Sequence, residues 1–481
     1  MGSTGEGTAR PALGVRHPPP TAHTETGSPA ETGDVEPQSC LWVPCITDLA
    51  DASAAGKVPA GRFGQGIAIL GGPDAVAIVG GPADPSGAYG GYSSGEAVEL
   101  TLPGLVRSSV WPTDTPWDYS TEAMSLREDP AGGYLLAVGA MSAHGALGRT
   151  GAVYLLRDEL PSGESLQAGA YATISGDGAG FSAGGQIALG AEVHWLTVSG
   201  IGASELVVAA PGTTPLPGDT VPDGAAIYAF DSSMTGSLDV FDADRKITAP
   251  KAGFGFHIAG WDGDSDGIKN LVATQGSANG SHDRVLAFSS PWVNDLTVDD
   301  ATAAWTLESS NVVDRIVDLG DVTGDGVPDL FTGAATWSGD GFARAGAAWV
   351  VPGGNLTGGS MLDAAIHLYG DEDGEGVGYD ATGGDFDGDG NVDLIVGCYG
   401  LSPAALPGKI VLFLGPVPDG ALDESVSDSV VHGEYPFDQF GMNLESLDVE
   451  SDGVAELLVG APGADRDMGR VYLLGSDALL Q

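Results

Sequence analysis

Short runs of apolar residues, separated by glycine, proline and acidic residues, recur along most of the chain. Two examples are "DLIVG", which ends at Gly397, and "ELLVG", which ends at Gly460. Each run is shorter than a typical helix and is bounded by turn-forming residues, which is the pattern of a β-strand. The sequence therefore predicts an all-β protein.

Seven of these runs align with one another and define an internal repeat. Their last residues are Gly80, Gly139, Ala209, Thr274, Gly333, Gly397 and Gly460. Successive ends are 59, 70, 65, 59, 64 and 63 residues apart. A period sustained at this length is typical of a repeat architecture.

Other features keep step with these anchor residues. A small or proline-containing turn often follows, as in Gly460-Ala461-Pro462, and the next run opens with glycine, as in "GRVYLL" from Gly469. Upstream lies an aromatic residue or valine, usually followed by glycine, which we call the slot. The slots are Phe63-Gly64, Phe254-Gly255, Val377-Gly378 and Phe440-Gly441, with weaker copies at Tyr119-Ser120, Phe181-Ser182 and Val313-Asp314.

Each period holds about four strand-like runs, and one such unit cannot bury both of its faces. Radial repetition with closure is the usual solution, so residues 48–481 are predicted to form a seven-bladed β-propeller of four-stranded blades. A right-handed β-solenoid is the alternative, but its rungs are much shorter than these periods. The last blade lacks a fourth run, which a segment within Asp48–Pro59 is placed to supply. Residues 1–47, rich in proline, glycine and threonine, are expected to be a disordered tail.

Charge restricts the partners. The chain has 18 basic and 66 acidic residues and a net charge of -48, which disfavours nucleic acid and anionic membrane surfaces. No apolar run approaches the roughly 20 residues that cross a bilayer, so no transmembrane segment is expected. The N-terminus lacks the apolar region of a signal peptide.

The stretch "GGDFDGDGNVDLIVG" carries oxygen-bearing side chains at alternate positions. These residues are Asp385, Asp387, Asp389, Asn391 and Asp393, and Asn391 would offer its backbone carbonyl. Several oxygen ligands around a glycine turn are typical of a calcium site. An EF-hand would place Glu at the twelfth position, where Val396 stands, so the loop is expected to join two strands.

The same loop recurs in phase in three other repeats. "DGDSDGIKN" supplies Asp262, Asp264, Asp266 and Asn270; "DVTGDGVPD" supplies Asp321, Thr323, Asp325 and Asp329; "DVESDGVAE" supplies Asp448, Glu450, Asp452 and Glu456. The third repeat reads "TVSGIGASE", with Ile201 in place of the central acid. Without a cation each acidic loop would crowd like charges together, so about four structural Ca²⁺ ions are expected in blades 4–7.

The repeat resembles the FG-GAP repeats of the integrin α-subunit β-propeller, and bacterial FG-GAP or VCBS-type proteins are similar. The resemblance covers about Asp48–Gln481 and rests on the slots, anchors and acidic loops above. It implies calcium-stabilised adhesion, with a protein or glycan ligand on the face opposite the metal loops. Repeats one to three, five and six depart from the full motif, which is a Phe-Gly slot together with a Gly-Ala-Pro turn.

Two catalytic or metal-binding motifs are better explained by the repeat. "GFSAG" at 180–184 matches a nucleophile elbow but occupies the slot of the third repeat. "DESVS" at 423–427 matches an integrin metal motif but lies inside the sixth repeat. Cys40 and Cys45 could form a local disulfide, and Cys398 is expected to be a small buried residue.

The favoured function is therefore a non-enzymatic, calcium-binding, extracellular or cell-surface ligand-binding protein with no catalytic residues. An enzyme acting on an extracellular polymer is an alternative, but it needs acidic, His or Arg residues grouped at the mouth of the ring, and no such group is visible in the sequence. An acidic extracellular scaffold without a specific partner is a third hypothesis.

Overall fold

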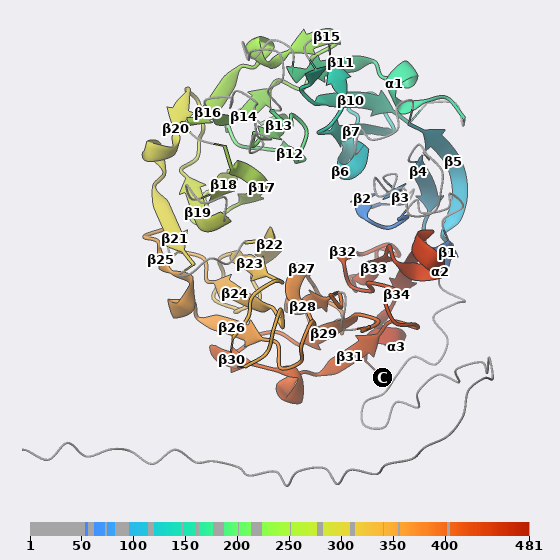
Figure 1. Ribbon diagram of the computed structural model, residues 1–481, viewed down its shortest axis with the longest axis vertical. Coiled ribbons are helices and arrows are strands. Elements are labelled where there is room, and N and C mark those ends of the chain that lie inside the picture. Colours follow the sequence, from blue (N-terminus) through green and yellow to red (C-terminus); the bar gives the residue numbers. More distant parts are fainter. Residues whose placement is uncertain are drawn as a thin grey trace, which may run out of the picture. The chain divides into compact units, whose positions relative to one another are not determined.

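A computed structural model gives a ring of seven β-sheets, with each sheet forming one blade (Figure 1). The structure describes residues 53–55, 62–72, 75–81, 96–113, 120–145, 148–158, 163–176, 187–200, 202–212, 224–250, 252–276, 282–307, 313–339, 341–354, 356–401 and 405–480. The chain divides into units Met1–Ser39 and Cys40–Gln481, and every described residue belongs to the second. The predicted tail, its boundary at residue 47, and Cys40 and Cys45 lie outside the described residues.

Four antiparallel strands build each blade, ordered from the innermost to the outermost. Blade 1 contains β2 (Gly66–Leu70), β3 (Val76–Gly81), β4 (Glu96–Thr101) and β5 (Val106–Pro112). Blade 2 contains β6 (Ser120–Glu128), β7 (Tyr134–Ala140), β10 (Ala152–Arg157) and β11 (Ala172–Ser175); blade 3 contains β12 (Val193–Leu196), β13 (Glu205–Ala210), β14 (Ala225–Phe230) and β16 (Arg245–Ala249). Blade 4 contains β17 (Phe254–Trp261), β18 (Asn270–Gly276), β19 (His282–Phe288) and β21 (Ala303–Thr306); blade 5 contains β22 (Arg315–Gly320), β23 (Asp329–Ala334), β24 (Ala347–Val351) and β26 (Ile366–Tyr369). Blade 6 contains β27 (Val377–Gly384), β28 (Asp393–Cys398), β29 (Lys409–Phe413) and β31 (Ser429–His432); blade 7 contains β32 (Asn443–Leu447), β33 (Glu456–Ala461), β34 (Arg470–Leu474) and β1 (Ser53–Ala55).

The ring closes as the sequence predicts. Strand β1, from the start of the described chain, pairs antiparallel with β34 of the last blade, with Ala54 opposite Val471. The backbone N–H of Phe63 also donates to the carbonyl of Met468, at 3.1 Å. Blade 7 is thus assembled from both ends of the described chain, which removes the free edge that β34 would otherwise present.

Blades 2–5 carry a fifth strand that the sequence did not indicate. The short strands β15 (Gly236–Asp239), β20 (Leu296–Thr297), β25 (Gly359–Ser360) and β30 (Gly420–Leu422) each lie parallel to the outermost strand of the preceding blade. Each is followed by one 3₁₀ turn: η3 (Val240–Asp242), η4 (Val298–Asp300), η5 (Met361–Asp363) or η6 (Glu424–Val426). The "DESVS" segment is one of these turns, because Asp423 caps η6 by accepting the Ser425 N–H at 2.8 Å.

Helices contribute little. Helix α1 (Leu166–Gly169) lies in blade 2, while α2 (Ala464–Asp467) and α3 (Ser476–Leu479) flank β34. A two-residue hairpin of β8 (His144–Gly145) and β9 (Gly148–Arg149) completes the described elements.

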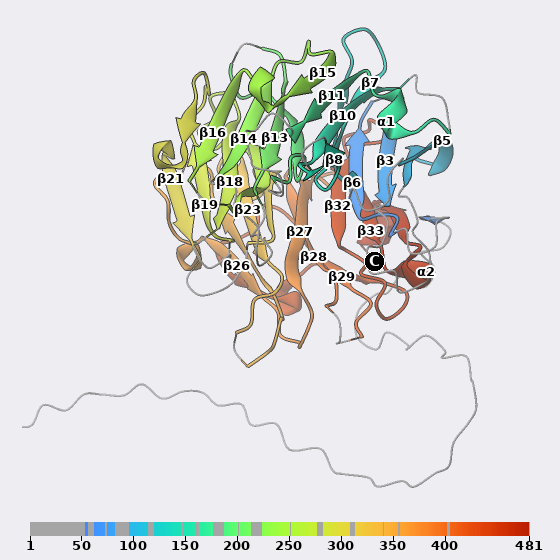
Figure 2. The same ribbon diagram turned by 45° about the horizontal axis from the view of Figure 1, so that its top comes forward.

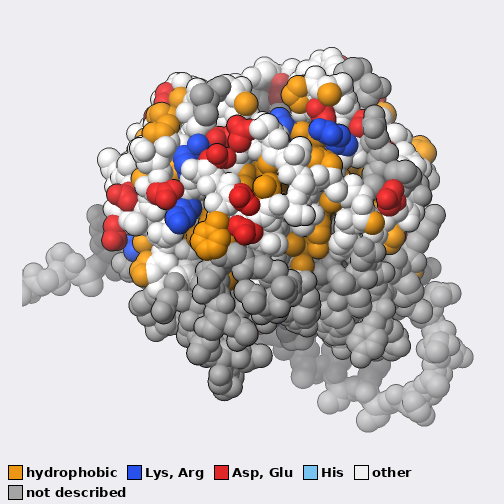
Figure 3. All heavy atoms as spheres, turned by 90° about the horizontal axis from the view of Figure 1, so that it is seen from above, with side chains coloured by type: hydrophobic (Ala, Val, Ile, Leu, Met, Phe, Trp, Pro, Cys, Tyr) orange, Lys and Arg blue, Asp and Glu red, His pale blue; other side chains and the backbone are white. Residues whose placement is uncertain are grey.

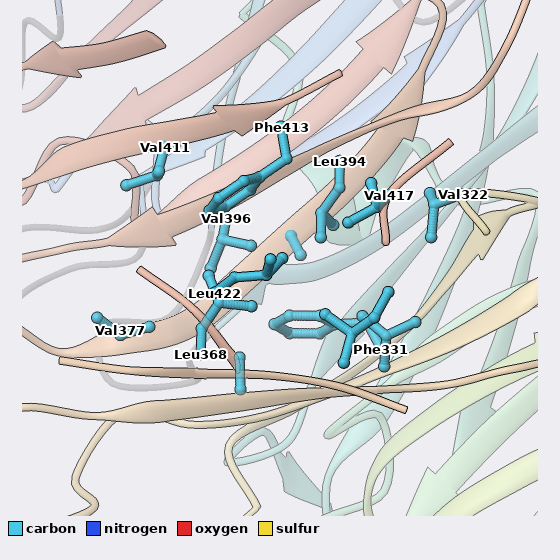
Figure 4. Packing of buried hydrophobic residues seen from close by; sticks show 14 of the residues in the cluster. Val322, Phe331, Leu368, Val377, Leu394, Val396, Val411, Phe413, Val417 and Leu422 are labelled. Atoms are coloured by element: carbon cyan, nitrogen blue, oxygen red, sulfur yellow. The ribbon is translucent and has the colours of Figure 1, made fainter. Parts of the chain in front are cut away.

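Hydrophobic side chains pack between neighbouring blades, whose strands rise side by side in Figure 2. Between blades 5 and 6, Phe331 and Leu368 face Val396 and Val411 across the gap between the sheets (Figure 4). Cys398 belongs to the same cluster and is only 2% exposed, so the prediction that it is a small buried residue is confirmed.

Glycine stands where consecutive blades come closest. A Cβ on the anchor Gly397 would overlap with the carbonyl oxygen of Gly441, at the start of blade 7. The same overlap with the next blade recurs at Gly80, Gly139, Gly333 and Gly460. A Cβ on Gly408, which precedes β29, would overlap with the backbone of the slot residue Phe440. The glycines of the repeat are therefore explained by contact between the backbones of adjacent blades.

The third slot was misplaced by sequence reasoning. In blades 1, 6 and 7 the slot residue forms a parallel bridge with the glycine before the third strand of the preceding blade, as Phe440 does with Gly408. In blade 3 the residue bridging Gly151 is Leu189, so the slot is Leu189-Gly190 and not Phe181-Ser182. An aliphatic residue fills this buried place as well as an aromatic one, and residues 177–186 lie outside the described part of the chain.

Figure 3 shows one side of the molecule, where acidic and basic side chains lie interspersed among hydrophobic ones. The acid excess of the chain is therefore not gathered into a single patch on this side. Close groups of three carboxylates occur instead within the loops that join the first two strands of a blade.

Replacing Gly397 by Ala is expected to lower the free energy of unfolding by about 2–3 kcal/mol, because the new Cβ must displace the Gly441 carbonyl. The measurement is the midpoint and slope of urea unfolding. The control is Gly475→Ala, since Gly475 has a φ of -91° and no atom near its Cβ position. Equal stability losses in the two variants would contradict this account of the anchor glycines.

Candidate metal loops

The four predicted loops occupy one structural position, between the first and second strands of blades 4–7. We number them by blade: loop 4 is 262–270, loop 5 is 321–329, loop 6 is 385–393 and loop 7 is 448–456. The ninth position is the first residue of the second strand in every case: Asn270, Asp329, Asp393 and Glu456. The strand–loop–strand setting that was expected is therefore found in all four.

The four loops follow the same backbone path. In each, the first Asp accepts the backbone N–H groups of positions five and six, as Asp385 does from Asp389 and Gly390 at 3.1 and 2.9 Å. The equivalent bonds go to Asp262, Asp321 and Asp448. Positions four and six both have positive φ: Ser265 and Gly267, Gly324 and Gly326, Gly388 and Gly390, Ser451 and Gly453. Repetition of this path shows that the acidic pattern specifies a defined loop.

Carboxylates converge in two of the loops. Oxygen atoms of Asp262, Asp264 and Asp266 lie within 4.8 Å of one another in loop 4. In loop 6 the converging set is Asp385, Asp387 and Asp393.

Not every predicted side chain joins a converging set. The Asn391 amide donates to Asp389 at 2.9 Å, and the Thr323 hydroxyl donates to Asp329 at 3.4 Å. Among the described residues, loops 5 and 7 do not bring three acidic side chains together in this way.

The acid at the ninth position is withdrawn from solvent. Asp329 is 0% and Asp393 is 1% exposed. Burial raises the pKa of both carboxyls and that of Glu456, and neighbouring loop carboxylates raise them further, although backbone N–H groups oppose the shift. The Gly415 and Phe386 N–H groups, for example, each donate to Asp393 at 2.8 Å. The ionised form of these acids is therefore costly unless a cation lies close by.

Blade 3 solves the same problem with arginine. Its equivalent segment "TVSGIGASE" ends at Glu205, which is 3% exposed and forms an ion pair with Arg245 of β16. The Arg245 guanidinium also lies 5.6 Å from the centre of the Trp292 ring. In blade 2, Arg157 pairs at 3.0 Å with Asp129, which lies in the loop before the second strand and does not begin it.

Loops 5, 6 and 7 have no such pair among the described residues. In loop 4, Lys269 pairs with Asp318 of the neighbouring blade and not with the loop acids. The donor set left to a cation is almost entirely oxygen, which suits a hard ion such as Ca²⁺. The residues present therefore fit the expected metal.

A second polar group lies around the ring axis, and sequence reasoning missed it. It is formed by Glu192, His194, His257, Arg315, Asp380 and Asn443, from blades 3–7. Glu192 lies 3.3 Å from His194 Nε2 and 3.1 Å from His257 Nδ1. These contacts hold the pKa of Glu192 below its usual range although burial opposes them.

Arg315 connects the other members of this axial group. Its guanidinium lies 3.0 Å from an Asp380 oxygen and 3.0 Å from the Asn443 amide oxygen. Burial, with Asp380 as a nearby like charge, raises the pKa of Glu445 to about 8. The sequence showed no group of acidic, His and Arg residues, yet the innermost strands bring one together. Counting three residues on from the predicted slots would have found part of it, namely His257, Asp380 and Asn443. Glu192 stands three residues after Leu189, the slot that sequence reasoning missed.

No protein-family model matches the chain, and no curated protein matches it. None of the helices in the described ranges is long and apolar enough to cross a membrane.

Replacing Arg245 by Gln is expected to cost about 3–5 kcal/mol of unfolding free energy, because Glu205 would remain buried without its counter-charge. Because the positive charge of Arg245 is part of the chain, the loss of unfolding free energy should be the same in calcium and in chelator. The control is Arg157→Gln, whose arginine is 50% exposed, and it should cost less than about 1 kcal/mol. Urea unfolding of both variants with and without calcium checks this, and a calcium-dependent loss in Arg245→Gln would refute it.

Proposed function

We propose that the protein is a non-enzymatic, calcium-stabilised β-propeller of the FG-GAP type that binds a protein or glycan outside the cell. The observation that carries the proposal is the recurrence of one loop path in four consecutive blades. Blades 2 and 3 pair the acids at this end with arginine, whereas loops 5–7 have no basic partner among the described residues. A metal ion is the remaining source of positive charge.

The proposed ions have a structural role. Asp262, Asp321, Asp385 and Asp448 would each supply ligands together with positions three, five and nine of their loop, and the bound ion would supply the positive charge that these carboxylates lack. Within each loop the acids span the end of the first strand and the start of the second, so an ion would fix that hairpin. Extracellular calcium modules bind with Kd values of roughly 10⁻⁴–10⁻³ M, which favours a calcium-rich location.

The proposed ligand face is the opposite end of the blades. Because the strands are antiparallel, the connections from second to third strands and from blade to blade lie at that end. Exposed aromatic side chains occur there: Tyr435 is 63%, Phe437 is 48% and Phe342 is 38% exposed. Aromatic residues are frequent anchors of protein and glycan interfaces.

The axial group supports a second candidate, an enzyme built on the propeller. Glu445 would hold its proton near neutral pH beside Asp380, whose carboxyl lies 3.0 Å from Arg315, and two carboxyls in unlike surroundings can serve acid–base chemistry. Against this, Glu192 and Arg315 contact other members of the group and tie five inner strands together. His194→Ala and His257→Ala should leave calcium-dependent ligand binding intact, and loss of a measurable turnover in either variant would favour the enzyme.

Calcium at millimolar concentration is expected to raise the Tm markedly relative to chelator, with about four ions bound by calorimetry. Asp385→Asn combined with Asp387→Asn should reduce the number bound by one, because both side chains belong to the converging set of loop 6. The matched control is Asp299→Asn, which changes an exposed acid on η4. Absence of both binding and a Tm shift in the unmodified protein would reject the calcium proposal.

The calcium effect is expected to weaken with acid. Since the pKa values of Asp329, Asp393 and Glu456 are raised, their ionisation costs folding free energy at neutral pH, and protonation relieves this cost but removes ligands. The Tm rise produced by calcium should therefore shrink as pH falls from about 7.5 to about 5. Thermal melts across this range test the prediction, and a constant rise would contradict it.

A further inference from the structure

We propose that the four calcium loops are coupled to one another, so that each ion strengthens binding in the neighbouring blade. This inference rests on the proposed calcium function and adds how the sites are regulated. It is carried by a hydrogen-bond relay that recurs between blades 3 and 7. The relay is formed by the turn that follows the third strand of each blade.

The relay is complete between blades 5 and 6. The Gly415 N–H donates to Asp393, the ninth residue of loop 6, at 2.8 Å. Two residues later, the Val417 N–H donates to the carbonyl of Val322, the second residue of loop 5, also at 2.8 Å. One short turn therefore contacts both loops. It binds the Asp393 carboxylate of loop 6 and the peptide of loop 5 that lies between its first and third ligand positions.

The same arrangement connects blades 4 and 5. The Gly353 N–H donates to Asp329 at 3.0 Å, and the Gly354 N–H donates to the carbonyl of Gly263 in loop 4 at 2.7 Å. The indole of Trp261, beneath loop 4, also donates to Pro328 of loop 5 at 2.7 Å. Loops 4 and 5 are thus connected twice, once through the turn at Gly353 and Gly354 and once through Trp261, the residue before loop 4.

Blades 6 and 7, and blades 3 and 4, are connected by variants of this contact. Between blades 6 and 7, the Ser476 hydroxyl donates to the backbone carbonyl of Phe386 at 2.6 Å, and the Ala455 N–H donates to the backbone carbonyl of Asp385 at 2.7 Å. Between blades 3 and 4, the Trp292 N–H donates to Val198 at 2.7 Å, and Asn270 donates to Ser290 at 3.2 Å. The loop of blade 3, whose Glu205 pairs with Arg245, is thus connected to loop 4 by the same kind of relay.

These contacts give coupling a physical route. In loops 5 and 6 a bound ion would fix the carboxylate at position nine, which fixes the turn and therefore the peptide in the preceding loop. In loop 7 the Ala455 N–H contacts loop 6 directly. The next ion then meets a loop that has lost part of its freedom, so less ordering entropy opposes its binding. Linkage requires the effect to be mutual, and coupling of this kind typically changes affinity by about fivefold or more.

Terbium luminescence excited through tryptophan can test this, because the Trp261 ring lies against loop 4 at Gly263. Loss of the signal in Asp264→Asn assigns it to loop 4. Asp325→Asn disables the adjacent loop 5, and Asp452→Asn is the matched control in the distant loop 7. Both acids are exposed at position five of their loops. We expect terbium affinity at loop 4 to fall by about fivefold or more in Asp325→Asn and by less than about twofold in Asp452→Asn.

A second variant leaves every ligand in place. Ser476→Ala removes one relay bond, so the number of calcium ions bound should be unchanged while the Hill coefficient of the calorimetric titration falls. The coupling is refuted, and the calcium function stands, if the unmodified protein binds about four ions, Asp325→Asn behaves like Asp452→Asn, and Ser476→Ala titrates like the unmodified protein. If the unmodified protein binds no ions, both proposals fall together.

Discussion

The close approach of one blade's backbone to the next is the constraint on which this fold depends. At Gly397 and Gly408 the chain of blade 6 lies so near the start of blade 7 that a Cβ has no room. The contact recurs around the ring, including across the seam between Gly460 and Gly64. It fixes the angle between sheets, and hydrophobic residues then fill the space farther out. The position of every loop and of the axial polar residues follows from it.

This constraint explains why so much of the architecture could be predicted. A backbone contact that tolerates only glycine leaves a mark in the sequence, and five of the seven repeats carry it at the anchor, as Gly333 and Gly397 do. A contact that many side chains can make leaves no recognisable residue in the sequence, which is why Leu189 was overlooked as the slot of blade 3. The parallel strand Leu296–Thr297 exists only because β16 of the preceding blade is beside it. The axial group required the ring itself, since it joins residues from separate blades.

The candidate metal loops show how one electrostatic problem can have two solutions in the same fold. A buried acid begins the second strand of blade 3 and of blades 5 and 6, at Glu205, Asp329 and Asp393. In blade 3 its counter-charge is Arg245, which is always present. In blades 5 and 6 the proposed counter-charge is a dissolved ion. The first solution gives constant stability, and the second makes stability depend on the surroundings.

The relay extends this dependence from single hairpins to the ring. A propeller whose blades touch only their neighbours behaves like a chain of linked units, and its weakest link is where closure rests on few contacts. In this ring that place is blade 7, where β1 contributes three residues, Ser53–Ala55, to a sheet otherwise made by the C-terminal chain. Loop 7 joins the two innermost strands of that same sheet, and Ser476 and Ala455 connect blade 7 to loop 6. Ordering that spreads along the coupled loops would therefore reach blade 7, where the pairing of β1 with β34 closes the ring.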